Sequence, residues 1–211
     1  MFKDRYEAAK LLAKKLSKYR NDEGIVLAIP RGGVPIGFVI AKELHFPLEM
    51  ILSKKIGHPN NPEFAIGSVS LDGAVIDDNV KNVPKVYIQI ETEKIHKQLK
   101  EKFKLFMGDH KPTDLRNKTV IIVDDGIATG NTLLASIKAI KKRIPNKIIV
   151  AVPVAPPSIA DRFKKEVDEF ICLLTPQDFL GVGQFYSDFS QVSDEEVIQL
   201  LQSANNKKEF A

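Results

Sequence analysis

The stretch Val120–Thr132, which reads VIIVDDGIATGNT, constrains the fold of this chain more than any other feature. Its first four residues are apolar, as in a strand that is buried on both faces of a parallel sheet. Two carboxylates, Asp124 and Asp125, follow this run directly, and a loop with two glycines then leads into a segment with helical spacing. In open parallel sheets, ligands bind where the strands end. The stretch therefore predicts an α/β fold with a binding site at the carboxyl end of a central strand.

The loop after this strand carries groups that suit a phosphate. The N-terminus of the following helix offers free N–H groups and a partial positive charge, and Gly130 lets the backbone turn inward. The hydroxyls of Thr129 and Thr132 can donate to phosphate oxygens. The loop has neither the GxxxxGKS/T nor the GxGxxG pattern, which excludes a Walker loop and a dinucleotide fingerprint.

The two carboxylates indicate what lies beside that phosphate. They would repel a second anionic group, whereas ribose hydroxyls donate hydrogen bonds to ionised carboxylates. A ligand with a phosphate at one end and a diol next to it satisfies both halves of the stretch. The alternative is an Asp-Asp turn that only caps the helix.

The same thirteen positions closely resemble the signature of the type I phosphoribosyltransferases, in which a hydrophobic strand and two acids precede a loop that ends in Thr-Gly-x-Thr/Ser. The resemblance implies the family fold, a Rossmann-like parallel sheet flanked by helices, with a mobile hairpin insert and a small C-terminal hood. It implies that Asp124 and Asp125 are catalytic residues that hold the ribose 2′- and 3′-hydroxyls of phosphoribosyl diphosphate. The residues that would bind the 5′-phosphate and its surroundings are Gly126, Ala128, Thr129, Gly130, Asn131 and Thr132.

A second motif, Pro30-Arg31-Gly32-Gly33, follows an apolar run at Ile25–Ile29. By itself it is an ordinary tight turn. It is similar to the Arg-Gly-Gly form of the family's pyrophosphate loop, which follows the first strand. The resemblance implies that Arg31 is a catalytic residue and that Gly32 and Gly33 let backbone amides approach the leaving pyrophosphate. It also implies a non-proline cis peptide near Pro30–Arg31.

A third motif is the pair Lys54-Lys55, which follows another apolar run. It is similar to the basic pair with which the family contacts pyrophosphate oxygens, and a solvated pair is the alternative. Beyond it we expect a loop and then a hairpin, because Asp72-Gly73 separates two short apolar pieces. The resemblance identifies residues 53–79 with the mobile hairpin that closes over the active site. Glu63 in this hairpin would pair with a basic residue or contact substrate.

Hydrophobic spacing outlines the remaining elements. Ser193 and Glu196 form a capping box at the start of the last helix. We see no linker or repeat, so we expect a single domain over residues 1–211, with a core of about residues 1–174 and a hood of about residues 175–204. The predicted helices cover about residues 2–16, 36–44, 84–107, 133–140 and 193–204, and the predicted strands cover residues 25–29, 48–52, 120–123, 147–152 and 170–174. A further short helix with a proline-rich start is predicted between the last two of these strands.

The resemblance also implies a reaction. Family members transfer ribose 5-phosphate from phosphoribosyl diphosphate to a nitrogen acceptor, often a nucleobase, and release pyrophosphate. The implied cofactor is Mg²⁺, held through the substrate near Asp124 and Asp125 and not in a preformed protein site. Family enzymes that act on 6-oxopurines carry an aspartate where this chain has Ala128. We therefore expect an acceptor other than a 6-oxopurine.

The hood is the part of the family fold that contacts the acceptor. Its aromatic residues either stack on the acceptor or form the hood's own core, and Asp188 is a candidate polar contact. A second function remains open, that of a regulatory protein that binds phosphoribosyl diphosphate or a nucleotide without catalysis. Homodimers are common in the family, but no sequence feature here decides the matter. The aromatic residues in question are Phe179, Phe185, Tyr186 and Phe189.

Composition limits the other classes. The net charge of +4 is mild and the basic residues are spread along several helices, so we expect no nucleic-acid partner. No apolar run approaches the roughly 18–20 residues of a membrane span, and the start lacks the apolar core of a signal peptide. We therefore expect a cytoplasmic location. The single cysteine, Cys172, lies in the apolar run EFICLL and is expected to be a core thiol.

Overall fold

Five parallel strands form the central sheet of the computed structural model, which describes residues 1–71, 73–77, 80 and 82–205. The strands are β1 (Gly24–Ala28), β2 (Leu48–Met50), β6 (Thr119–Val123), β7 (Lys147–Val154) and β8 (Glu169–Leu174). Their spatial order is β2-β1-β6-β7-β8, and every neighbouring pair is parallel. β1 and β6 are buried along their whole length, as the apolar runs predict.

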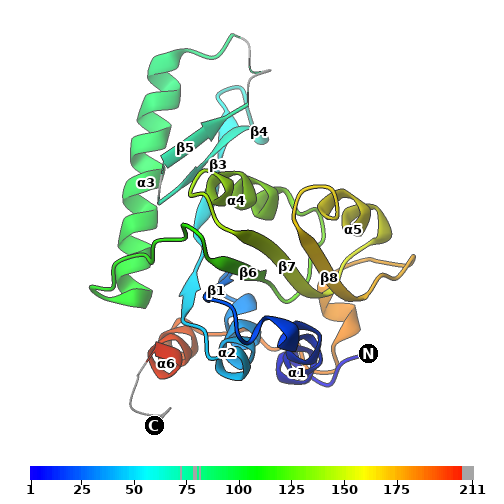
Figure 1. The fold of residues 1–211 in the computed structure, drawn as a ribbon. Coiled ribbons are helices and arrows are strands. Elements are labelled where there is room, and N and C mark those ends of the chain that lie inside the picture. The colour runs from blue at the N-terminus through cyan, green and yellow to red at the C-terminus, as the bar shows by residue number, and fades with distance from the viewer. Residues whose placement is uncertain (72, 78–79, 81, 206–211) are drawn as a thin grey trace.

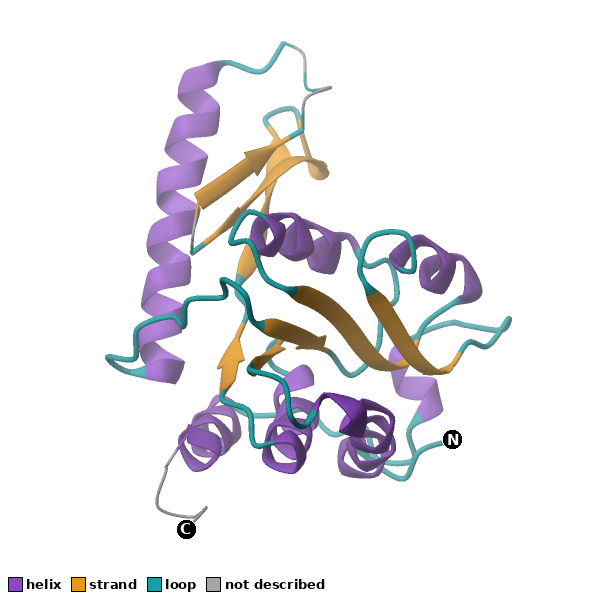
Figure 2. Ribbon diagram, viewed as in Figure 1, coloured by secondary structure: helices purple, strands orange, loops and turns teal. Residues whose placement is uncertain are grey.

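Helices cover both faces of this sheet (Figures 1 and 2), so the predicted α/β class is confirmed. The helices of the first face are α1 (Arg5–Leu16), α2 (Gly33–Leu44) and α6 (Asp194–Asn205), and those of the second are α4 (Asn131–Lys141) and α5 (Pro157–Phe163). Successive side chains of a strand point to opposite faces. Val26 and Ile121 accordingly pack with α1, α2 and α6, whereas Ile25 and Ile122 pack with α4 and α5.

A three-stranded antiparallel sheet and the long helix α3 (Lys85–Met107) form an arm that projects from the central sheet (Figure 1). The strands of the arm are β3 (Ser53–His58), β4 (Asn61–Ser70) and β5 (Gly73–Ile76). Ile56, Ile66 and Val69 of this sheet and Ile95 and Leu99 of α3 are buried in one apolar cluster with the main core. The arm is therefore packed on the domain and is continuous with its core.

The predicted hairpin is β4–β5, with Ser70 opposite Gly73; its other turn residue, Asp72, lies outside the described residues. The prediction of a loop before the hairpin was wrong, because Ser53–His58 is a strand that pairs with β4. Ile56 alone of this strand is fully buried. A strand with one apolar anchor gives no alternating hydrophobic pattern, and it is held by its neighbour's backbone.

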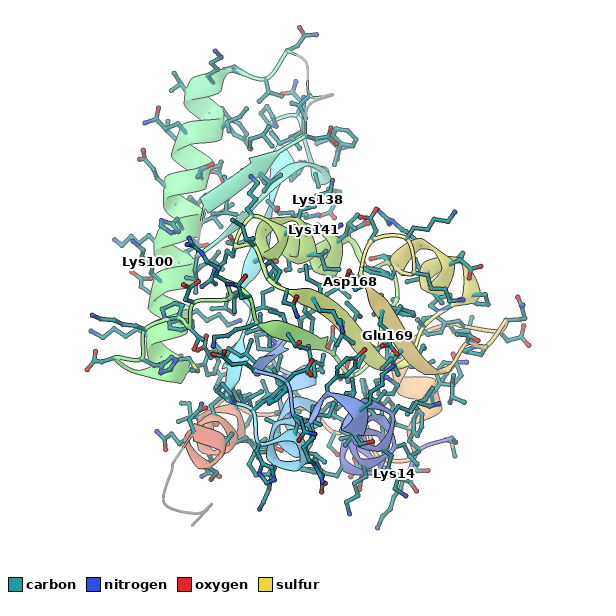
Figure 3. All side chains as sticks on the ribbon, viewed as in Figure 1. Lys14, Lys100, Lys138, Lys141, Asp168 and Glu169 are labelled. Carbon is teal, nitrogen blue, oxygen red and sulfur yellow. The ribbon has the colours of Figure 1, made fainter. Side chains whose placement is uncertain are left out.

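The predicted cap at the start of the last helix is confirmed. The N–H of Glu196 donates to Oγ of Ser193 over 3.1 Å, which caps α6. Two short 3-10 helices, Ser17–Tyr19 and Val182–Phe185, complete the description. Among the described residues, no helix is both long and apolar enough to cross a membrane. Basic side chains are dispersed over the surface, as shown by Lys14 on α1, Lys100 on α3 and Lys138 on α4 in Figure 3.

Candidate active site

The strand order places two of the predicted motifs side by side. From β1 the chain runs outward through β2 in one direction, while β6, β7 and β8 lie in the other. The loops after β1 and β6 therefore leave the same edge of the sheet at its topological switch point, where ligands of open α/β sheets bind. The N–H of Ile29 donates to the carbonyl of Val123 over 2.9 Å, which joins the two loops at their base.

The loop after β1 lies close against the end of β6. Its Pro30–Arg31 peptide is cis, at the position that the sequence analysis predicted. A Cβ atom at Gly32 would lie 1.9 Å from Oδ2 of Asp125, and one at Gly33 would lie 2.8 Å from the carbonyl oxygen of Val123. Both glycines are therefore required for this approach. The N–H of Gly33 donates to the carbonyl of Ile29 over 2.9 Å, so this amide is engaged within the loop.

Asp124 and Asp125 form an acid pair at the end of β6. The N–H of Asp125 donates to Oδ1 of Asp124 over 2.8 Å. Burial raises the pKa of Asp124 well above its usual range, and the negative charge of Asp125 raises it further. Burial also raises the pKa of Asp125, and the Arg5 guanidinium opposes that shift. The free site therefore holds two half-buried acids beside one strong cation, an arrangement that favours a ligand that donates hydrogen bonds or carries positive charge.

The loop between these acids and α4 is rich in free donors. Among the described residues, the N–H groups of 128–132 have no protein acceptor. Gly130 has a φ of 70°, in the left-handed region, which turns the chain into the helix. Ala128 and Thr129 are exposed, while a Cβ at Gly126 would lie 2.6 Å from Val182 of the hood. The loop thus presents backbone donors to solvent at a helix N-terminus, which is suitable for a phosphate.

The structure separates the two lysines of the third motif. Nζ of Lys54 donates to Oε1 of Gln98 on α3 over 3.0 Å, whereas Nζ of Lys55 lies 2.8 Å from the exposed Glu63 carboxylate. Neighbouring residues of a strand point to opposite faces, so the two cations do not face the same space. Glu63 thus pairs with a basic residue, one of the two alternatives that the sequence left open.

Lys54 lines a cavity of about 370 Å³ between the loop after β1, α3 and α4. Lys102 and Gln98 of α3 and Thr132 of α4 line it as well. Lys102 could not be singled out from the sequence, because it is one of several lysines along α3 whose spacing is typical of a solvated face. The polar residues that line the cavity are two lysines, one glutamine and three residues with hydroxyl groups, a composition suited to an anion.

Arg31 lies further out than its motif suggested. Its Nη1 is 3.5 Å from Oδ1 of Asp194, at the start of α6. It lines an open hollow of about 530 Å³ together with Pro30, Lys102 and Glu101. The structure therefore brings the loop of Arg31 to the acid pair but directs the guanidinium towards α6.

The hood lies against the acid pair and contacts it through Tyr186. The hydroxyl of Tyr186 donates to the carbonyl of Asp125 over 2.7 Å, and its ring stacks on Phe189 with 5.1 Å between centroids. The rings of Phe179 and Phe185 stack at 5.5 Å. These aromatic residues contact one another and the loop after β6. The contacts favour the alternative in which they form the hood's own core over the one in which they stack on the acceptor.

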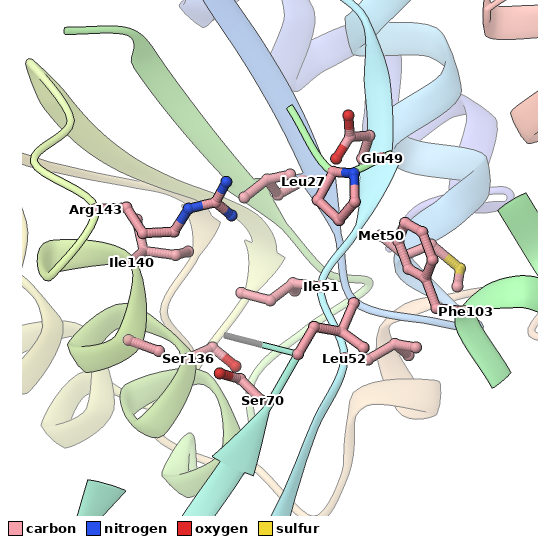
Figure 4. A pocket seen from close by; sticks show the side chains of 13 residues that line it. Leu27, Glu49, Met50, Ile51, Leu52, Ser70, Phe103, Ser136, Ile140 and Arg143 are labelled. Atoms are coloured by element: carbon pink, nitrogen blue, oxygen red, sulfur yellow. The ribbon is translucent and has the colours of Figure 1, made fainter. Parts of the chain in front are cut away.

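A further cavity lies between β2, β4 and α4 (Figure 4), but it measures only about 40 Å³. It contains the buried carboxylate of Glu49, which accepts from His110 Nε2 over 2.8 Å and from the N–H of Thr113 over 3.1 Å. This cavity is too small for a sugar phosphate, and the Glu49 carboxylate in its wall already has protein hydrogen-bond partners.

Metal binding by the protein alone is not indicated at the edge of the sheet. Within the described ranges, no three His, Cys, Asp or Glu side chains lie together as a metal site. Mg²⁺ keeps waters and substrate oxygens as ligands and needs few protein ones. Two adjacent acids with raised pKa values fit a metal ion that arrives with its substrate, because its positive charge would offset theirs.

Comparisons with known proteins agree with this geometry. The family model described as "Phosphoribosyl transferase domain" matches residues 4–190. A protein of Mycobacterium tuberculosis (strain H37Rv) named "Putative phosphoribosyl transferase" is 36% identical over 215 residues, which cover all of this chain and 48% of that protein. This chain thus spans about half the length of the curated relatives it matches.

A solved structure shares the whole fold. The crystal structure of TT1426 from Thermus thermophilus is 33% identical, with a TM-score of 0.87, over 96% of this chain and 98% of that one. The family model covers most of the chain, including both glycine loops, the acid pair and the hood as far as Ser190. The chain therefore belongs to the phosphoribosyl transferase domain family.

Proposed function

We propose that this chain transfers ribose 5-phosphate from phosphoribosyl diphosphate to a nitrogen acceptor and releases pyrophosphate. The observation that carries the proposal is the meeting of three features at one switch point. These are the acid pair, the free N–H groups of 128–132 and the lysine-lined cavity. One ligand with a diol, a monophosphate and a diphosphate would satisfy all three.

In this proposal, Asp124 and Asp125 accept hydrogen bonds from the ribose hydroxyls, and residues 128–132 donate to the 5′-phosphate. Lys54 and the loop of Arg31, Gly32 and Gly33 receive the pyrophosphate as it leaves. Positive groups there favour the transition state, in which negative charge grows on the leaving group. When Mg²⁺ is bound with the substrate, it offsets further charge on the diphosphate. Lys55 contributes less to this site than the sequence suggested, because its ammonium group is paired with Glu63.

The acceptor proposed is a nucleobase other than a 6-oxopurine. The support is Ala128, an exposed residue of the acid loop whose methyl group can neither donate nor accept a proton. We propose that this activity resides in one domain, with its core in residues 1–174, the mobile hairpin in residues 53–79 and the hood in residues 175–204.

The test is incubation with phosphoribosyl diphosphate, Mg²⁺ and a panel of adenine, hypoxanthine, guanine, xanthine, uracil and orotate. Pyrophosphate release that depends on one base other than the 6-oxopurines is expected. Tight binding of the diphosphate without release for any base would instead favour the regulatory alternative, a protein that binds this ligand without turnover. Release that depends on hypoxanthine or guanine would overturn the acceptor assignment.

A further inference from the structure

Arg5, near the start of α1, lies in the candidate active site although 120 residues separate it from the acid pair. Its Nε and Nη2 each lie 2.9 Å from Oδ2 of Asp125. Its Nη1 donates to the carbonyl of Ser190 over 2.8 Å, and its guanidinium carbon lies 4.0 Å from the centre of the Phe189 ring. The Arg5 side chain is 11% exposed and that of Asp125 is 15% exposed. One guanidinium thus joins the acid pair to the hood.

The backbone fixes Arg5 in this place. The N-terminal segment runs beside the hood, where the N–H of Phe2 donates to the carbonyl of Phe185 and the N–H of Ser187 donates to the carbonyl of Phe2, both over 2.8 Å. The N–H of Asp188 donates to the carbonyl of Lys3 over 2.8 Å. Asp4 then caps α1 by accepting from the N–H of Glu7. Arg5 is therefore presented to Asp125 by a pre-organised segment.

The contacts of Arg5 indicate what it does. Each of its three nitrogens already donates to a protein acceptor, and one face of its guanidinium lies on Phe189. Only Oδ2 of Asp125 is engaged by Arg5, which leaves Oδ1 for a ligand. We propose that Arg5 is a positioning residue for the proposed transfer reaction. It fixes the Asp125 carboxylate so that its second oxygen receives a ribose hydroxyl, and it locks the hood beside the acid pair.

The electrostatic setting supports this role. The charged and titratable groups that face Asp125 are Arg5 from α1, Asp124 from the same strand end and Tyr186 from the hood. Burial and Asp124 disfavour a second negative charge here, and Arg5 is the cation that offsets it. An arginine suits the position, because its planar fork contacts one carboxylate through two nitrogens and stacks on an aromatic ring, which a lysine does not do.

The inference rests on the proposed function. The experiment gives different results if the role of Arg5 is wrong and if the proposed function is wrong. Calorimetry would measure the binding of phosphoribosyl diphosphate with Mg²⁺, and of pyrophosphate without added metal, to the wild type, Arg5→Met, Arg5→Lys and Arg20→Met. Arg20→Met is the matched control, because Arg20 pairs with Glu43 and both of their side chains are exposed. Circular dichroism would establish that each variant is folded.

We expect Arg5→Met to weaken phosphoribosyl diphosphate binding by about 10- to 100-fold, the usual effect of losing a group that orients a ligating side chain. Pyrophosphate, which has no diol, should bind as in the wild type, and Arg5→Lys should restore part of the lost affinity. Equal loss for both ligands would mean that Arg5 only maintains the structure, and wild-type affinity in Arg5→Met would overturn the inference. If the wild type itself does not bind phosphoribosyl diphosphate, the proposed function fails, whatever Arg5 does.

Discussion

Gly32 lies directly beneath the carboxylate of Asp125, so that a Cβ atom at position 32 would come within 1.9 Å of Oδ2. Gly32 has a φ of −61° and a ψ of −29°, which any residue adopts. The glycine is therefore required for space and not for conformation. We predict that Gly32→Ala displaces Asp125 or the loop, costing about 1–3 kcal/mol. Most of this cost should appear as weaker phosphoribosyl diphosphate binding in calorimetry, because the displaced groups form the site.

Gly181→Ala is the control for this prediction. Gly181 lies in the hood with an extended backbone, and a Cβ atom there would have no neighbour within 4 Å. This variant should bind and unfold like the wild type. If Gly32→Ala also retains full affinity, Asp125 is not held in the position that the ligand requires.

Lys54 and Lys55 provide a second test, because they are adjacent in sequence but face different surroundings. Lys54→Met and Lys102→Met should each weaken pyrophosphate binding by about tenfold, the effect of losing one charge-assisted hydrogen bond. Lys55→Met removes the same charge from a site paired with Glu63 and should change the affinity little. The measurement is pyrophosphate titration at low ionic strength. Equal losses for Lys54 and Lys55 would contradict the assignment of the cavity to the leaving group.

Much of the fold could be predicted from the sequence because the information is local. Buried strands such as Val120–Val123 are continuous apolar runs, and the cap formed by Ser193 and Glu196 lies within a single helical turn. Strand β3 could not be predicted, since it has one buried apolar residue, Ile56, and is held by pairing with β4. The pair Lys54-Lys55 lies on this strand, so its two side chains point in opposite directions. The sequence alone did not indicate this, because the strand itself could not be predicted.

The candidate site was harder to complete from sequence. The acid pair and the glycine loops are contiguous motifs, so their positions could be predicted. Arg5 and Lys102 join the site only through tertiary structure, and both lie on helices where a basic residue normally faces solvent. Arg31 shows the reverse, since its motif places the loop correctly while the side chain turns towards Asp194.

Cys172 should be a poor nucleophile. Burial raises the pKa of its thiol to about 11, and its Sγ donates to the carbonyl of Leu174 over 3.1 Å. At pH 8 only about one thiol in a thousand would be ionised, and the thiolate is the reactive form. We predict that iodoacetamide modifies the native protein far more slowly than the urea-unfolded chain, as followed by intact mass. Comparable rates would mean that the thiol is accessible and ionised, contrary to its role in the core.

Asp124→Asn should make the free protein more stable while it weakens substrate binding. Burial and the neighbouring Asp125 raise the pKa of Asp124, so the folded protein holds this proton more tightly than the unfolded chain does. Its stability therefore falls as pH rises from the ordinary carboxyl pKa through the raised one. Asparagine removes that cost, and a gain of about 1 kcal/mol would raise the melting temperature by about 2–4 °C for a chain of this size.

The pH dependence and the ligand distinguish this origin from a general stabilising effect. The advantage of Asp124→Asn should be larger at pH 8 than at pH 5, because the wild-type protein loses stability as the pH rises from the ordinary carboxyl pKa through the raised pKa of Asp124. Asp109 is exposed, so Asp109→Asn is the control. It should have the melting temperature of the wild type at both pH 5 and pH 8. With phosphoribosyl diphosphate and Mg²⁺ the order should reverse, since the folded wild type binds this ligand more tightly than the variant does, and its melting temperature rises with the ratio of ligand concentration to Kd. A higher melting temperature of Asp124→Asn that is independent of pH, or that persists with saturating ligand, would contradict the prediction. It would show that the buried charge of Asp124 does not destabilise the free protein in exchange for substrate binding.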